Sequence, residues 1–186
     1  SKRKLVINEA ITLSGMGCRA GGTRLGFGVE IGPDVCGDLV ELSSLHVGGP
    51  LDVSPFDVTQ VRLVKVSVTA PADEPAIYVD EIGLRIPPAG QADGRVLLED
   101  CWVRGGSVGV RINAVGCMLR RCRVQGAQTY GIQAFAHFSI EGCTIGDCGL
   151  AKRGGGILTR AGVLQLRGAN GMDDNRVQRE WFDKDY

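Results

Sequence analysis

The chain lacks net charge, long apolar runs and CxxC pairs, and each absence excludes a class of function. Its 186 residues carry 21 lysines and arginines against 21 aspartates and glutamates, so no overall field attracts it to nucleic acid or an anionic membrane. No apolar run is long enough for a transmembrane helix, and no secretory signal pattern is present. Without a CxxC pair near His46 or His137, the cysteines lack a zinc-binding pattern. We therefore expect no metal, no cofactor, no nucleic-acid partner and no membrane partner.

Glycine is abundant, whereas proline and aromatic residues are scarce. The chain has 28 glycines, 7 prolines and 5% aromatic residues. Many glycines without low complexity suit tight turns between short strands and disfavour helices. The 7 cysteines are an odd number, and a free cysteine commonly behaves as a small buried apolar residue. We expect thiols in the core and a reducing, intracellular compartment that keeps them reduced.

A repeat of 21 residues organises the middle of the chain. Cys101, Cys122 and Cys143 are each 21 residues apart, within the pattern apolar-x-x-Cys-x-apolar. A constant period of this kind is typical of a solenoid of stacked strands. The pattern predicts a core ladder of Leu98, Cys101, Val103, Leu119, Cys122, Val124, Ile140, Cys143 and Ile145.

The same pattern extends into the first half and is interrupted by insertions. It occurs at 42–47 and again, 21 residues later, at 63–68. The next step is longer by 14 residues centred on 87–94, which predicts a loop on one face of the solenoid. After Ile145 two registers remain open: a strand in 163–168, or a repeat of the pattern beginning at Met172.

Stacking in this register also predicts which polar residues are neighbours. One outward column contains Glu99, Arg120 and Glu141, and the next contains Lys65, Asp100 and Arg121. Opposite charges alternate along these columns, which fixes the register. A third column brings Arg123 beside Trp102, so that a guanidinium lies near an indole. The alternative is a binding face for an acidic glycan or acidic protein segment, formed by Trp102, Arg104, Arg111, Arg120, Arg121 and Arg123.

The segments LLEDCWVRGGSVGV, MLRRCRVQGAQTYGI and SIEGCTIGDCG resemble the repeats of right-handed parallel β-helix proteins with a pectin-lyase-like fold. Carbohydrate-binding and sugar-hydrolase repeats belong to this group. The resemblance implies an all-β, right-handed parallel β-helix of about six to seven coils. We expect a single domain over 1–186, with regular coils over about 28–165 and an irregular cap or docking tail over 166–186.

The resemblance also implies what a catalytic member would need. Polygalacturonase-like hydrolysis requires clustered aspartates with a histidine and a lysine, whereas the one aspartate pair here is Asp173-Asp174. Pectate-lyase-like elimination requires acidic calcium ligands and an arginine base. The acidic residues Glu99, Asp100 and Glu141 are predicted to stack against arginines, which would satisfy them without metal. No complete constellation is recognisable, so catalytic residues and metal ligands are not assigned.

The sequence favours a non-catalytic scaffold or protein-interaction module that forms part of a larger assembly. Trp181, Phe182 and Tyr186 form a candidate docking tail, because aromatic residues anchor interfaces. The alternative is a carbohydrate-binding or polysaccharide-degrading β-helix protein. A ubiquitin-ligase recognition module and a trimeric phage-type fibre also remain open, and the expected partners are other protein subunits.

Overall fold

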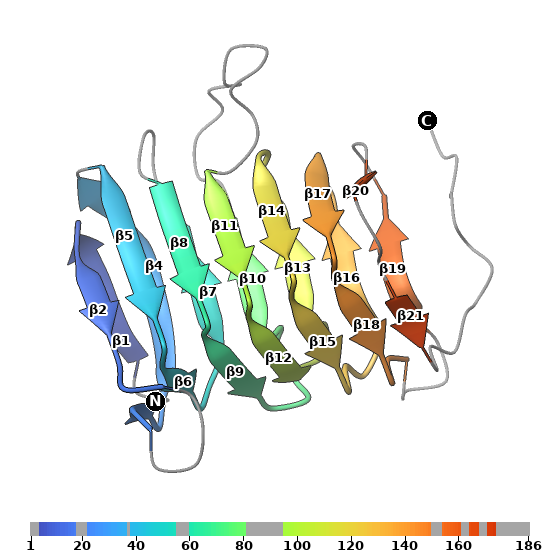
Figure 1. Cartoon of the computed structure of the whole chain (residues 1–186), viewed down its shortest axis with the longest axis horizontal. Helices are drawn as coiled ribbons and strands as arrows, with labels where there is room; N and C mark the ends of the chain where they lie inside the picture. The colour runs from blue at the N-terminus through green and yellow to red at the C-terminus, as the bar shows by residue number, and fades with distance from the viewer. Residues whose placement is uncertain are drawn as a thin grey trace.

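The computed structural model is a parallel β-solenoid of about six turns with a period near 22 residues. It describes residues 4–17, 22–36, 38–54, 60–80, 95–149 and 154–160, and the backbone of 164–167 and 171–173. The described residues form strands and turns, with no helix among them. Successive coils lie side by side along the long axis of the molecule (Figure 1). The all-β solenoid predicted from the 21-residue repeat is confirmed.

Three seven-stranded sheets form the walls of the solenoid, and each coil contributes one strand to each sheet. Neighbouring strands within a sheet are parallel. Sheet A consists of β1 (Lys4–Glu9), β4 (Gly28–Cys36), β7 (Leu51–Val53), β10 (Ile77–Val79), β13 (Val110–Ile112), β16 (Tyr130–Ala134) and β19 (Gly155–Thr159).

The other two sheets meet at the corner that follows each strand of sheet B. Sheet B consists of β2 (Thr12–Ser14), β5 (Leu39–Ser43), β8 (Gln60–Val64), β11 (Val96–Glu99), β14 (Cys117–Arg120), β17 (Phe138–Glu141) and β20 (Leu164–Arg167). Sheet C consists of β3 (Arg24–Leu25), β6 (His46–Val47), β9 (Ser67–Ala70), β12 (Trp102–Gly105), β15 (Arg123–Gln125), β18 (Thr144–Gly146) and β21 (Gly171–Asp173).

The apolar repeat sets the register of sheet B from one end to the other. Its central column contains Leu13, Leu42, Leu63, Leu98, Leu119, Ile140 and Leu166. The step from Leu63 to Leu98 includes the long insertion, so the extra residues leave the stacking intact. Residues 81–94 themselves lie outside the described residues.

The structure selects one of the two registers left open after Ile145. Leu166 pairs with Ile140, so 164–167 is the next strand of sheet B. Met172 pairs with Ile145 in sheet C, which contradicts the register in which Met172 begins a new repeat. Strands β20 and β21 therefore continue the sheets past residue 165, where we expected the regular coils to end.

The interior is a continuous apolar column along the axis. The nine core-ladder residues are all buried, none with more than 2% of its surface exposed: Leu98, Cys101, Val103, Leu119, Cys122, Val124, Ile140, Cys143 and Ile145. Leu45 and Val66 occupy the equivalent of the cysteine position in two earlier coils and are also buried. Each coil thus covers the apolar residues of its neighbour, as expected if burial of apolar area holds the stack together.

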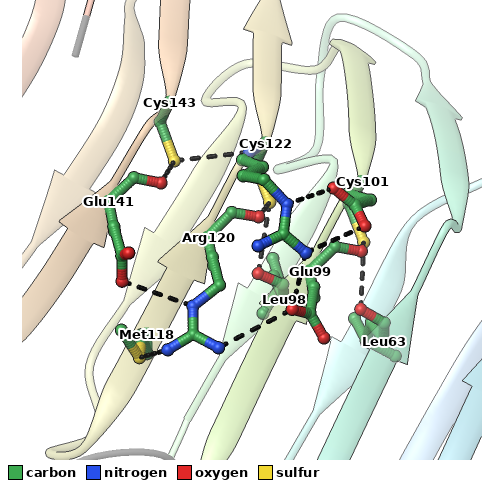
Figure 2. Close-up of polar contacts among 11 residues, drawn as sticks. Leu63, Leu98, Glu99, Cys101, Met118, Arg120, Cys122, Glu141 and Cys143 are labelled. Carbon is green, nitrogen blue, oxygen red and sulfur yellow. Dashed lines mark hydrogen bonds and ion pairs between the residues drawn. The ribbon is translucent and has the colours of Figure 1, made fainter. Parts of the chain in front are cut away.

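The stacked cysteines are free thiols that bond to the neighbouring coil. The thiol of Cys101 donates to the carbonyl of Leu63, with 3.1 Å between Sγ and O. The Cys122 thiol donates to the Leu98 carbonyl at 3.2 Å, and Cys143 repeats the contact with the preceding coil. Figure 2 shows the contacts of Cys101 and Cys122 at the same position in two successive coils. Each of these thiols is therefore a small buried side chain that also donates a hydrogen bond to a backbone carbonyl of the preceding coil.

Buried thiols of this kind are poor nucleophiles and poor metal ligands. Burial raises the pKa of the Cys117 thiol to about 12. The hydrogen bond with Cys122, together with burial, raises the pKa of Cys143 well above its ordinary value. Because the thiolate is the reactive form, the raised pKa values disfavour reaction at Cys117 and Cys143.

Candidate functional site

A column of ion pairs runs along the outer face of sheet B. Arg120 lies between Glu99 and Glu141 in the register of β11, β14 and β17. Its guanidinium is 3.7 Å from the Glu99 carboxylate and 3.3 Å from that of Glu141. Figure 2 shows the side chain between the two carboxylates. The alternation of charge predicted from the sequence is therefore present, and Arg120 is already neutralised by the protein itself.

A second ion-pair group lies at the corner between sheets B and C. Nε of Arg121 donates to Asp100 at 2.8 Å, and an Nη atom donates to Glu99 at 2.7 Å. Hydrogen bonds from Arg121 hold the pKa of the Asp100 carboxyl below its ordinary value. The chain turns here through a left-handed residue in five consecutive coils: Ser44, Lys65, Asp100, Arg121 and Gly142. Four of these five residues are not glycine. The coils therefore share a left-handed backbone conformation at this corner but not a residue type.

Reversing the charge of Arg120 should destabilise the solenoid. Arg120→Glu places three carboxylates in one column, and like charges facing each other on adjacent strands repel. We expect the free energy of unfolding to fall by about 1–2 kcal/mol, or about 3–6 °C in melting temperature. Arg123→Glu is the control, because Arg123 lies between Trp102 and Thr144 on sheet C. Melting temperatures that agree between the Arg120 variant and wild type would contradict the ion-pair column.

The Asp100–Arg121 pair should make stability sensitive to acid. In the unfolded chain Asp100 has an ordinary pKa of about 3.9, whereas in the folded protein the pKa is lower. The pair therefore stabilises the fold fully above about pH 4, and its contribution is lost as pH falls through the lowered pKa. Arg121→Gln should reduce the slope of stability against pH in denaturant titrations between about pH 5 and pH 2. The same slope in both proteins would show that the pair contributes nothing.

Sheet C carries the tryptophan and two of the predicted arginines. Arg104 lies two residues after Trp102 on the same strand, and its guanidinium carbon is 3.8 Å from the centre of the indole ring. The sequence predicted this contact for Arg123, which pairs with Trp102 in the register but makes no recorded ring contact among the described residues. Neither Arg104 nor Arg123 forms an ion pair within the described residues, and both are exposed. The indole nitrogen of Trp102 is buried without a hydrogen-bond partner.

Sheet A holds the remaining predicted arginine, Arg111, in a group that the sequence did not reveal. Its guanidinium carbon lies 5.6 Å from the ring centre of Tyr78 and 5.3 Å from that of Phe135. Arg160 lies 6.0 Å from the same Phe135 ring. Asn113 donates to the Tyr78 hydroxyl at 2.8 Å, and that hydroxyl donates to Asp80 at 2.9 Å. The sequence signal that could have found this group is the spacing of about one coil between aromatic residues and arginines.

The six residues predicted to form one binding face are divided among the three walls. Arg111 lies on sheet A, Arg120 on sheet B, Arg121 at the corner, and Trp102, Arg104 and Arg123 on sheet C. The members on sheet B and at the corner are neutralised by carboxylates. Two separate surfaces therefore retain arginines without a carboxylate partner in the described part: sheet C and sheet A. The predicted docking tail, Trp181, Phe182 and Tyr186, lies outside the described residues.

His46 has a structural environment on sheet C. Its Nδ1 lies 3.3 Å from the hydroxyl oxygen of Ser67, and Nε2 is buried without a partner. Burial, and then the charge of Arg24, lower the pKa of His46 below its ordinary value. Within the ranges that the structure describes, no three His, Cys, Asp or Glu side chains are grouped as metal ligands would be. In those same ranges no helix is long and apolar enough to cross a bilayer.

Comparison with known proteins found no relative of this chain. No family model, no curated protein and no solved structure matches the chain. What is established is the class of architecture: a parallel β-solenoid whose walls present arginines and aromatic rings.

Proposed function

We propose that this chain is a non-catalytic interaction module, a rigid solenoid that presents arginine–aromatic surfaces to protein partners within an assembly. The observation that carries the proposal is the surface of sheet C. There the Arg104 guanidinium lies 3.8 Å from the Trp102 ring centre, and no carboxylate of the described residues neutralises it. Arg123, one coil further along, is also exposed and unpaired within the described part.

The chemistry of these side chains suits an interface. Tryptophan and arginine are the residue types most enriched among those that dominate binding energy. Parallel pairing of β12 with β9 and β15 holds the backbone at Trp102 and Arg123 on adjacent strands, so the backbone there is already ordered before a partner binds. Unpaired arginines on a rigid sheet favour a partner that supplies carboxylates.

The free buried thiols support a reducing, intracellular compartment for this module. Cys101, Cys122 and Cys143 are stacked in consecutive coils and are buried without a disulfide. Thiols at such spacing persist where glutathione and thioredoxin keep them reduced.

The second candidate is a carbohydrate-binding or polysaccharide-degrading protein of the pectin-lyase-like group. The outward aromatic rings favour it, because Trp102, Tyr78 and Phe135 could each support a sugar ring. The position of Arg104 against the Trp102 ring opposes it, since a sugar would have to displace that guanidinium. We therefore prefer a protein partner.

Size fractionation of a native extract, followed by cross-linking mass spectrometry, tests the proposal. We expect the chain in a heavy fraction, with cross-links between its exposed Lys65 and other proteins. The double variant Arg104→Gln/Arg123→Gln should shift the chain to a lighter fraction. Arg62→Gln is the matched control, because Arg62 is paired with Glu41 on sheet B. A monomeric peak for the wild-type protein would contradict the proposal, and glycan screening would then test the second candidate.

A further inference from the structure

Near the carboxyl ends of the strands of sheet A, rings and guanidiniums from successive coils alternate in a ladder that shifts by two residues between Arg111 and Phe135. Tyr78 on β10 is directly paired with Arg111 on β13. Phe135 and Arg160 directly follow β16 and β19, the next two strands of the sheet. Backbone bonds fix both positions, since the Phe135 amide donates to Ile112 and the Arg160 amide donates to Ala134. Four consecutive coils therefore contribute one member each, in the order Tyr78, Arg111, Phe135 and Arg160.

The ladder is held in place from one side by hydrogen bonds. The Tyr78 hydroxyl accepts from Asn113 and donates to Asp80, which fixes the ring against Arg111. Burial, and then the hydrogen bond to Asp80, raise the pKa of Tyr78, so the hydroxyl stays protonated and keeps donating. Because this ring is fixed, the guanidinium of Arg111 beside it needs little reorganisation to bind a ligand.

The two guanidiniums are accessible and have no anionic partner in the described part of the chain. Arg111 is half-buried and Arg160 is exposed, and neither forms an ion pair there. The Nε of Arg111 is buried without a hydrogen-bond acceptor, and Oδ1 of Asn113 is buried without a donor. Arg120 and Arg121, by contrast, have carboxylates within 3.3 Å and 2.8 Å. The ladder thus contains donors that an incoming carboxylate would satisfy.

We propose that this ladder binds an acidic peptide segment of a protein partner, which runs obliquely to the solenoid axis with one carboxylate at Arg111 and another at Arg160. This inference rests on the proposed interaction function and names a second surface for it. Arg111 shares a row with Gln133 and Leu158, so Arg160 lies two strands away and two residues further along the strand direction. The two backbone positions are therefore about 12 Å apart. In an extended peptide, residues four apart lie on the same face and are separated by about 13 Å, so acidic residues at positions i and i+4 match the two guanidiniums.

The arrangement favours a peptide over an acidic glycan. Arg111 and Arg160 lie 5.3 Å and 6.0 Å from the Phe135 ring centre, and Arg111 also lies beside Tyr78. A sugar ring would compete with these guanidiniums for the aromatic faces. A carboxylate on a narrow extended chain can approach the guanidinium edges while the rings remain covered.

Fluorescence anisotropy with purified protein tests the ladder directly. The probe is a labelled, end-blocked nine-residue peptide with aspartate at every fourth position, separated by glycine and serine. We expect binding that weakens with salt, and a loss of about tenfold in affinity for Arg111→Gln/Arg160→Gln. The double variant Arg62→Gln/Lys65→Gln removes the same charge from sheet B and its corner, and it should retain affinity within about twofold. Arg111→Lys should lose part of the affinity, because it keeps the charge without the planar fork.

Several results would overturn the inference. Equal losses in the two double variants would indicate a general charge effect. If a peptide with three adjacent aspartates bound with equal affinity, the proposed spacing between the two acidic residues would be wrong. If an acidic oligosaccharide bound more tightly at Arg111 and Arg160, the ligand of the ladder would be a glycan and not a peptide. Thermal melts check that each variant is folded. If Arg111→Gln does not fold, Arg160→Gln is tested alone, because Arg160 is exposed.

The inference and the proposed function fail separately. Cross-linked partners that do not depend on Arg111 and Arg160 would leave the interaction function standing and remove the ladder from it. A chain without partners in the extract would overturn the function, whereas peptide binding by the purified protein would still be measured independently.

Discussion

Cys122→Asp should abolish folding or lower the free energy of unfolding by at least about 4 kcal/mol. The Cys122 side chain is 2% exposed and lies within the core column between Cys101 and Cys143. An aspartate there must bury a carboxylate, or be protonated at a cost, among apolar residues. With total stability of about 5–15 kcal/mol for an ordinary domain, the soluble folded fraction should fall sharply. Thermal melting and denaturant titration measure the effect.

The matched control is Cys122→Val. Val66 occupies the equivalent position two coils earlier and is buried to 1% exposure. A similar volume in the same column should change stability by less than about 1.5 kcal/mol, part of which is the lost bond from the thiol to the Leu98 carbonyl. If the aspartate variant melts within a few degrees of the valine variant, then Cys122 does not occupy the core.

Gly131→Val should lower the free energy of unfolding by about 3 kcal/mol or more, because overpacking forces neighbouring coils apart. Gly131 is a buried residue of β16 in sheet A, where a Cβ would collide with the Ile145 side chain. It would also lie 2.8 Å from the Gly156 carbonyl oxygen and 3.1 Å from the Cys148 sulfur. Backbone atoms of the next coil cannot move away without breaking the ladder, so the expected loss in melting temperature is at least about 6 °C.

Gly26→Val is the comparison for this prediction. A Cβ at Gly26 meets no atom within 4 Å, so the same change in residue type should cost little. If both valine variants melt alike, the close approach of the coils at Gly131 is not what requires glycine there. Gly109 offers an independent repeat, since its Cβ would collide with Val124 and lie 2.5 Å from the Gly131 carbonyl oxygen.

The stacking of the middle coils was predictable because no insertion interrupts their period. From Leu98 to Leu119 and from Leu119 to Ile140 the equivalent positions are 21 residues apart. The alternation of apolar and polar residues predicts which side chains point inward. Neighbours such as Glu99 and Arg120 followed from the register alone, since parallel in-register strands place equivalent residues next to each other. The register after residue 160 could not be chosen from the sequence, because the repeat there is irregular. Both a strand in 163–168 and a repeat beginning at Met172 fit the apolar pattern.

The division of the arginines among three walls could not be read from the same pattern. The 21-residue period gives the number of residues in one coil, but it does not show at which residues the chain turns from one sheet to the next. The turn between sheets B and C is made by left-handed residues such as Lys65 and Arg121, with φ of 55° and 50°. Lysine and arginine seldom adopt this conformation, so nothing in the residue type at positions 65 and 121 signals a corner.

The sequence by itself determined the solenoid, its core ladder and the charge columns, because periodic burial of apolar side chains requires that stacking whatever the shape of the turns. Only the tertiary structure decided which guanidinium meets which ring. Arg104 rather than Arg123 lies over Trp102, and Arg111 lies between Tyr78 and Phe135 on another wall. These contacts depend on corner geometry and on the choice of rotamer by long side chains, and neither is encoded in the repeat.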